Sequence, residues 1–150
     1  MTVERLERGQ LVRRSLREVF GFFARAENLE RITPPWLGFA LVTPSPVEMR
    51  AGTTIEYRLR LHGIPLSWVS VIELWDEGKA FVDRQLRGPY RVWRHQHEFT
   101  EVDGGTLVRD RVDYALPFGR VGSLVGLPIV RRDLARIFDY RREAVAGLLG

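Results

Sequence analysis

Two of the three histidines in this 150-residue chain lie two positions apart, in the stretch "WRHQHEF" from Trp93 to Phe99. Successive side chains of a β-strand point to opposite faces, so on a strand His95 and His97 share one face. Two imidazoles on one face suit a metal site, an acid–base pair or the polar part of an apolar pocket. The strands and turns around the two histidines decide between these three kinds of site.

The turn that follows predicts what lies across from the histidines. Asp103-Gly104 in "VDGGT" is a strong signal for a two-residue hairpin turn. That turn predicts the inward pairs Phe99 with Val108, His97 with Asp110, His95 with Val112 and Trp93 with Tyr114, and the outward pairs Glu98 with Arg109 and Arg94 with Asp113. A Gly104-Gly105 loop is the alternative, and it breaks the apolar match by placing Phe99 opposite Asp110.

The pair His97 and Asp110 then has three readings. It is a buried hydrogen-bonded pair, or an acid–base or ligand-orienting pair in which Asp110 sets the tautomer of His97, or part of a metal site with His95. We expect no metal, because His95 faces Val112 and no residue is evident that would orient the ligands. In "AFVDRQL" both faces are mixed, so the sequence leaves open whether Asp83 joins the histidines.

A second hairpin lies in "TTIEYRLRLHGIPLSWVSVIEL". If Gly63-Ile64 form its loop, the inward pairs are Leu61 with Leu66, Leu59 with Trp68, Tyr57 with Ser70 and Ile55 with Ile72. His62 is then a solvated turn residue on the outer face.

The ends of the chain predict helices around a run of six strands between 39 and 116. Residues 9–14 are expected to form a short strand, and Ser15 with Glu18 forms a capping box for a helix. A second short helix, about 26–32, ends at the prolines of "TPPW". The C-terminal segment predicts a long helix with a kinked or loose entry at "GSLVGLP". Its apolar stripe consists of Val130, Leu134, Ile137, Phe138, Val145 and Leu148.

Composition narrows the class of protein. The length predicts one domain, residues 1–150, and the lack of cysteine excludes disulfides and thiolate chemistry. The net charge of +4 comes from 23 basic and 19 acidic residues that interleave, so we expect no nucleic-acid partner. No apolar run is long enough to span a membrane, which predicts no stable membrane anchoring, and the charged N-terminus is unlike a signal peptide, which predicts a cytoplasmic protein.

The motifs "ENLERITPPW", "LHGIP", "FVDRQLRGPY", "WRHQHEF", "GGTLVRDRVDYALPFG" and "IFDYRRE" resemble those of the START/SRPBCC superfamily, which includes birch-pollen-allergen-like and bacterial polyketide cyclase/dehydrase-like proteins. The resemblance covers essentially the whole chain. It implies an α+β helix-grip fold, in which a curved seven-stranded antiparallel sheet and two short N-terminal helices enclose an apolar cavity with a long C-terminal helix. It implies no single activity, since members include binders of hydrophobic molecules and polyketide cyclases.

Combined with the strand faces, this predicts a ligand-binding wall made of Tyr57, Leu59, Trp68, Ser70, Trp93, His95, His97, Phe99, Asp110, Val112, Tyr114, Val130, Leu134 and Phe138. We expect a binder or carrier of a hydrophobic small molecule such as a lipid, polyketide, isoprenoid or quinone, with no cofactor and its portal near Gly122 to Pro128. The alternative is a cyclase, aromatase or dehydratase that uses His97 and Asp110, and a homodimer is kept open.

Overall fold

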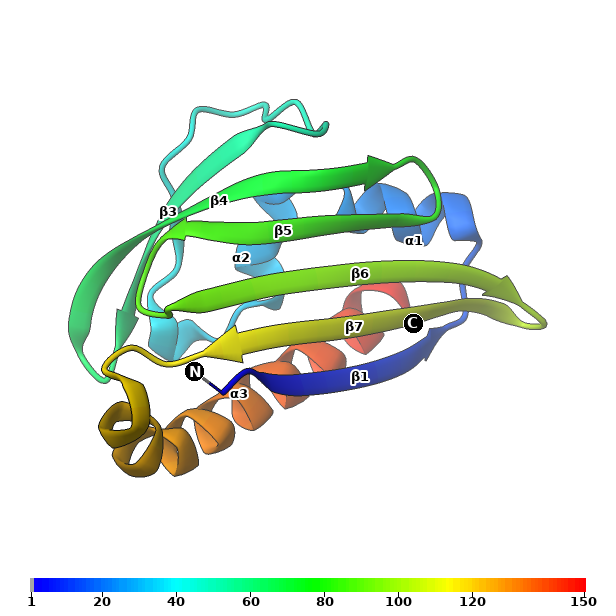
Figure 1. The fold of residues 1–150 in the computed structure, drawn as a ribbon. Helices are drawn as coiled ribbons and strands as arrows, with labels where there is room; N and C mark the ends of the chain where they lie inside the picture. Colours follow the sequence, from blue (N-terminus) through cyan, green and yellow to red (C-terminus); the bar gives the residue numbers. More distant parts are fainter. Residues whose placement is uncertain (1) are drawn as a thin grey trace.

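A computed structural model describes residues 2–150 and contains one curved antiparallel sheet with helices on one side (Figure 1). The strand order is β1-β7-β6-β5-β4-β3-β2. The strands are β1 (Glu4–Val12), β2 (Ala40–Leu41), β3 (Thr54–Leu61), β4 (Ile64–Asp76), β5 (Ala80–Arg87), β6 (Val92–Val102) and β7 (Gly105–Ala115). The helices are α1 (Leu16–Phe23), α2 (Leu29–Ile32) and α3 (Gly119–Leu149), with 3-10 turns η1 (Ala26–Asn28) and η2 (Pro35–Leu37). The seven strands and the long last helix confirm the predicted helix-grip fold.

The first strand was misplaced by the sequence prediction. It runs over Glu4–Val12 rather than 9–14, and it pairs with β7 along its whole length. Burial alternates along the strand, and the inward positions include the polar residues Arg8 and Gln10 as well as Leu6 and Val12. A strand whose inner face is half polar has little hydrophobic periodicity, so its extent cannot be recognised from the pattern.

The β6–β7 hairpin has the predicted register. His97 lies opposite Asp110, His95 opposite Val112 and Phe99 opposite Val108. The strands end at Val102 and begin again at Gly105, so Asp103-Gly104 is the turn and the Gly104-Gly105 alternative is excluded.

The β3–β4 register differs from the prediction by two residues. The loop is His62-Gly63 rather than Gly63-Ile64, and the observed pairs are Leu61 with Ile64, Leu59 with Leu66, Tyr57 with Trp68 and Ile55 with Ser70. His62 and Gly63 have φ values of 50° and 80°. A tight turn of this kind needs positive φ at both central residues, which a β-branched residue such as Ile64 resists and histidine tolerates. A shift of two keeps every side chain on its predicted face.

The helices largely follow their sequence signals. Ser15 caps α1 by accepting a hydrogen bond from the Glu18 backbone N–H at 3.2 Å. The predicted 26–32 helix consists of η1 followed by α2. The expected entry at "GSLVGLP" is not a loose segment but the first turns of α3, with Pro128 inside the helix. Phe118, which precedes α3, and Val121 and Leu124 on its first turns are exposed.

The core divides into parts on either side of a central space. Val19, Phe20 and Phe23 of α1 pack with Phe81 and Phe99 of the sheet. Leu134 and Phe138 of α3 pack on Val112 and Tyr114 of β7. The helices therefore close the two ends of the concave face and leave the middle, over β3 to β6, less filled.

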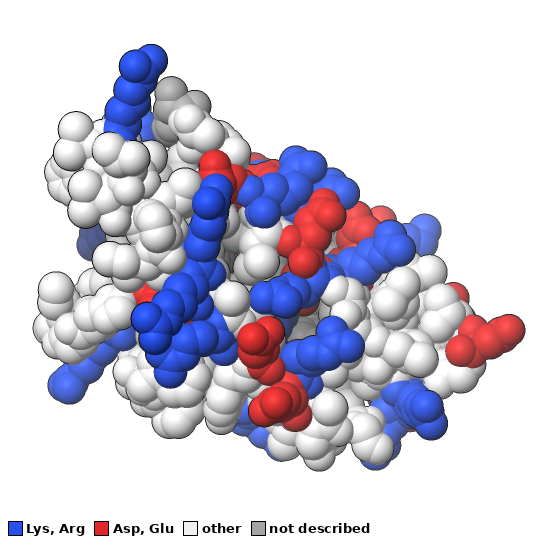
Figure 2. Space-filling view, turned by 90° about the horizontal axis from the view of Figure 1, so that it is seen from below, with Lys and Arg blue, Asp and Glu red and all other residues white. Residues whose placement is uncertain are grey.

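Surface charges interleave rather than gather. On the face that carries α3 and β1, blue and red side chains alternate, and the part at the left, where α3 begins, is mostly uncharged (Figure 2). Among the described residues, no helix is long and apolar enough to cross a membrane.

Candidate functional site

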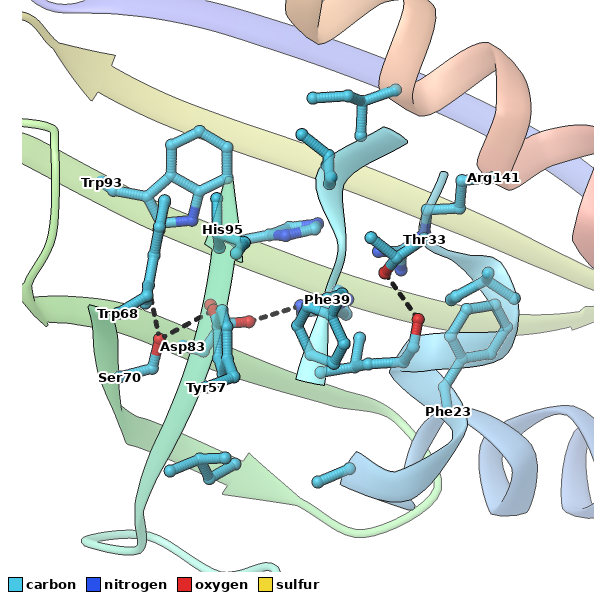
Figure 3. Close-up of a pocket in the computed structure, with 18 of the residues that line it drawn as sticks. Phe23, Thr33, Phe39, Tyr57, Trp68, Ser70, Asp83, Trp93, His95 and Arg141 are labelled. Atoms are coloured by element: carbon cyan, nitrogen blue, oxygen red, sulfur yellow. Dashed lines mark hydrogen bonds and ion pairs between the residues drawn. The ribbon is translucent and has the colours of Figure 1, made fainter. Parts of the chain in front are cut away.

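A cavity of about 180 Å³ lies in the middle of the concave face, between the sheet, α2 and α3 (Figure 3). Nine of the predicted wall residues line it: Tyr57, Leu59, Trp68, Ser70, Trp93, His95, His97, Leu134 and Phe138. Aromatic rings form much of this wall, with Tyr57 stacked on Trp68 at 5.9 Å between ring centroids and Trp93 edge-on to Trp68 at 5.2 Å. The arrangement is that of an apolar pocket with a few convergent polar groups.

Five predicted wall residues do not line the cavity. Phe99 lies against Phe20 in the cluster under α1. Val112, Tyr114 and Val130 pack where α3 covers β7, and Asp110 lies behind His95. These side chains face inward as predicted, but helices cover that part of the inner face. The alternation of side chains along a strand cannot show which part of a face a helix covers.

Asp83 and Arg141 both line the cavity, although the sequence left the direction of Asp83 open and did not predict a role for Arg141. Asp83 pairs with His95 across β5 and β6, which places it on the inner face. Arg141 interrupts the spacing of Leu134, Phe138 and Val145 along α3. A charged residue at an apolar-stripe position was the signal that could have found it.

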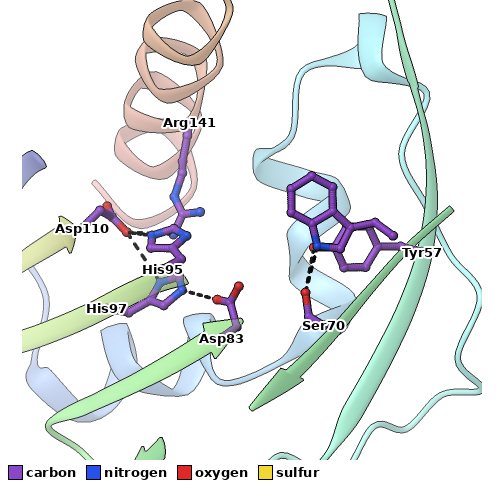
Figure 4. Close-up of polar contacts among 8 residues, drawn as sticks. Tyr57, Ser70, Asp83, His95, His97, Asp110 and Arg141 are labelled. Atoms are coloured by element: carbon purple, nitrogen blue, oxygen red, sulfur yellow. Dashed lines mark hydrogen bonds and ion pairs between the residues drawn. The ribbon is translucent and has the colours of Figure 1, made fainter. Parts of the chain in front are cut away.

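The two histidines are paired with carboxylates, but not as predicted (Figure 4). His95 Nε2 lies 2.8 Å from Asp110 Oδ1, and His97 Nε2 lies 2.7 Å from Asp83 Oδ2. His97 Nδ1 is 3.5 Å from Asp110 Oδ1 and has no hydrogen bond there. The prediction of His97 and Asp110 as the hydrogen-bonded unit is therefore wrong, and so is that of His95 as a neighbour without a carboxylate partner.

Diagonal contacts explain this exchange. Asp83 lies directly opposite His95, and Asp110 directly opposite His97, yet each carboxylate bonds to the other histidine. Diagonal neighbours in an antiparallel sheet are within reach of long side chains. The imidazoles stack at 3.7 Å between centroids, and the His97 ring also stacks on Phe81 at 4.1 Å.

Arg141 completes the polar cluster from α3. One of its guanidinium nitrogens, Nη2, lies 3.4 Å from Asp110 Oδ1, and the group lies over the rings of Phe23 and Phe138. The guanidinium thus holds the α3 end of a continuous chain of contacts that runs through Asp110, His95 and His97 to Asp83.

Burial and charge together set the protonation of this cluster. Burial, reinforced by the charge of His95, lowers the pKa of His97 to about 4 despite the opposing carboxylates. Burial raises the pKa of Asp110, but Arg141 and the histidines outweigh it and lower the pKa overall. The pKa of Asp83 is lowered in the same way, chiefly by its hydrogen bond with His97. At neutral pH, His97 is therefore neutral and donates its Nε2–H to an ionised Asp83.

A second polar group lies across the cavity. Trp68 Nε1 donates to Ser70 Oγ at 3.0 Å, and the Tyr57 hydroxyl is 3.4 Å from the same oxygen. Burial, with the charge of Asp83, raises the pKa of Tyr57, so its hydroxyl stays protonated. These hydroxyls can donate to or accept from a polar group inside the cavity.

Asp83, His95 and His97 offer ligand atoms within 4.8 Å of one another, so they are the candidate set for a metal ion, in place of the predicted set with Asp110. Both Nε2 atoms, however, are engaged with carboxylates. The rings lie only 22° from parallel, so their in-plane lone pairs run side by side instead of converging on one point. The geometry is that of a hydrogen-bonded network.

The comparisons with known proteins agree with this fold. The family model described as "Polyketide cyclase / dehydrase and lipid transport" matches residues 12–139. The chain belongs to this family. No curated protein matches the sequence.

Solved structures of several kinds share the family's fold. A START superfamily protein from Mycobacterium smegmatis has a TM-score of 0.73 at 9% identity, over 97% of this chain and 96% of that one. Ara h 8.0201 has a TM-score of 0.69 at 14% identity, over 99% and 98%. The di-domain ARO/CYC StfQ from the steffimycin biosynthetic pathway has a TM-score of 0.70 at 13% identity, over 98% of this chain and 50% of that one.

Proposed function

We propose that this protein binds a hydrophobic small molecule inside the cavity, without transforming it. The observation that carries the proposal is the pairing of an apolar, aromatic wall with a buried polar cluster at one side, which includes Asp83 and His97. A fully packed core gains nothing from ordering such a cluster, because burying charged groups costs free energy even when they are paired. A bound molecule with an apolar body and one polar group uses both features.

Extraction of the purified native protein followed by mass spectrometry tests the proposal. Leu59 of β3 lines the cavity, and Leu11 of β1 is 48% exposed at an outward strand position, so the same Leu→Phe substitution at each site gives a matched pair. We expect a co-purifying apolar compound that is depleted in L59F and retained in L11F. Equal recovery from both variants, or a folded protein that retains no compound and gains no thermal stability from added apolar compounds, contradicts the proposal.

An acid–base enzyme of the cyclase or dehydratase type is the second candidate, favoured by the family description and by the two histidine–carboxylate pairs. The poor access of a substrate to the ring nitrogens of His97 argues against this enzyme. Its Nε2–H is directed at Asp83, and its Nδ1, the atom that could take a proton, is buried and faces Asp110. A general base must come within hydrogen-bond reach of the proton it removes. If His97→Ala leaves turnover of an active substrate unchanged, this mechanism is excluded.

A further inference from the structure

Asp83 brings an ionised carboxylate with one unused oxygen to the cavity wall. Its Oδ2 accepts the hydrogen bond from His97 Nε2, and among residues 2–150 no hydrogen bond to its Oδ1 is found. The side chain is 20% exposed, whereas those of His95 and His97 are 6% and 5% exposed. Figure 4 shows Asp83 between His97 and the side of the cavity that carries Tyr57 and Ser70. An ionised carboxylate only accepts hydrogen bonds, so Asp83 Oδ1 can accept a hydrogen bond from a donor on a bound ligand.

The cluster around this oxygen carries no excess positive charge. Asp83 and Asp110 contribute two negative charges, Arg141 contributes one positive charge, and His97 is neutral at pH 7. The sum is −1 if His95 is neutral and 0 if His95 is protonated. In neither case does a ligand anion gain net attraction.

Arg141 lines the cavity, but its positive charge is already paired with the Asp110 carboxylate. Its Nη2 contacts Asp110 at 3.4 Å, and its guanidinium carbon lies over the rings of Phe23 and Phe138, at 5.4 Å and 5.7 Å from their centroids. Its side chain is 13% exposed. A ligand carboxylate could reach it only by competing with Asp110 and by approaching Asp83.

The volume indicates the size of the group that the cavity holds. A cavity of roughly 150 Å³ lined by apolar side chains accommodates benzene. The cavity here, of about 180 Å³, is slightly larger, so it has room for one ring with one or two small substituents. The rings of Trp68 and Trp93 provide walls against which a flat ring can pack.

We propose that the cavity selects an uncharged ring compound bearing a hydroxyl group, which donates its proton to Asp83 Oδ1, and that it discriminates against the corresponding carboxylate. This rests on the proposed binding function and deepens it by naming the class of ligand. A protonated amine also donates and is attracted to the Asp83 carboxylate, but the desolvation of an ammonium ion in a mostly apolar space costs more than that of a hydroxyl, and a buried ion pair offsets this cost only in part. The hydroxyl is therefore the donor that the site favours.

Calorimetric titration of the native protein with compounds on one skeleton tests this. The probes are 4-methylphenol, 4-methylanisole, which lacks the donor, and 4-methylbenzoate, with 4-methylbenzylamine as the cationic arm. We expect 4-methylphenol to bind about tenfold more tightly than 4-methylanisole, a difference of about 1.4 kcal/mol, and 4-methylbenzoate to bind more weakly than both.

Asp83→Asn gives a sharper second measurement. His97 Nε2–H still needs an acceptor, so the amide oxygen faces His97 and the amide nitrogen, a donor, faces the cavity. The tenfold preference for 4-methylphenol should then disappear, and 4-methylbenzoate should gain affinity by about tenfold. Ile72→Val, which trims an apolar cavity residue, is the control and should weaken all probes by a similar factor.

The outcomes separate the two proposals. If 4-methylphenol and 4-methylanisole bind native protein equally, or if the benzoate or the amine binds most tightly, the selectivity inference is wrong while the binding function stands. If no probe binds the native protein, the selectivity inference is wrong as well, and the extraction experiment alone then decides whether the binding function stands. The comparison on native protein decides the question even if D83N does not fold.

Discussion

The buried, neutral state of His97 predicts a specific loss of stability in weak acid. Burial lowers the pKa of this imidazole to about 4 in the folded protein, whereas an unfolded histidine titrates near ~6.5. At a pH between these two values, the unfolded chain therefore binds a proton at His97 that the folded protein does not bind. The contribution of His97 to stability is complete above the unfolded pKa and is lost as the pH falls from ~6.5 toward about 4.

The size of this effect follows from the two pKa values. Between pH 7 and pH 4.5 the linkage relation gives a loss of about 2 kcal/mol in the free energy of unfolding. The lowered pKa values of Asp83 and Asp110 place their losses at lower pH, below the ordinary range of a carboxyl group. The window from pH 7 to pH 4.5 therefore leaves out most of the loss that comes from these two carboxylates.

Urea denaturation at the two pH values measures the loss, and His97→Gln separates it from the other groups. The glutamine amide can still donate toward Asp83 but does not titrate. We expect the variant to lose about 2 kcal/mol less than the native protein over this window. His62→Gln is the control, since that histidine is 66% exposed and its removal leaves the buried contribution intact. Equal losses in the native protein and in H97Q would refute the reasoning.

Three further predictions concern stability, and chemical denaturation measures each. Leu134→Ala removes a buried side chain and should lower the free energy of unfolding by about 2–5 kcal/mol, whereas Leu124→Ala on the exposed face of the same helix should change it by less than about 0.5 kcal/mol; similar losses would contradict the burial of Leu134. Arg141→Met leaves Asp110 without its cation and should cost about 3 kcal/mol, and adding Asp110→Asn should restore part of this; strict additivity of the two changes would argue against the pair. Ser15→Ala removes the α1 cap and should cost about 1 kcal/mol, so an unchanged midpoint would show that the cap contributes little.

The sequence predicted the structure correctly where a single short segment specifies it. Asp103-Gly104 determined the β6–β7 register, because a two-residue turn and matched apolar faces leave one pairing favoured. Ser15 determined the start of α1 in the same way. In β3–β4 the faces were correct and the pairs were wrong by two residues, because alternation specifies the face of a side chain but not its partner.

By itself, then, the sequence determined the fold class, the order of elements and the inward direction of His95 and His97. Only the tertiary structure decided which carboxylate each histidine meets, because diagonal contacts across twisted strands depend on side-chain reach rather than on register. It also decided that Asp83 faces the cavity and that Arg141 neutralises Asp110 from α3. Those contacts join residues far apart in the chain, and only the packing of the helix against the sheet brings them together.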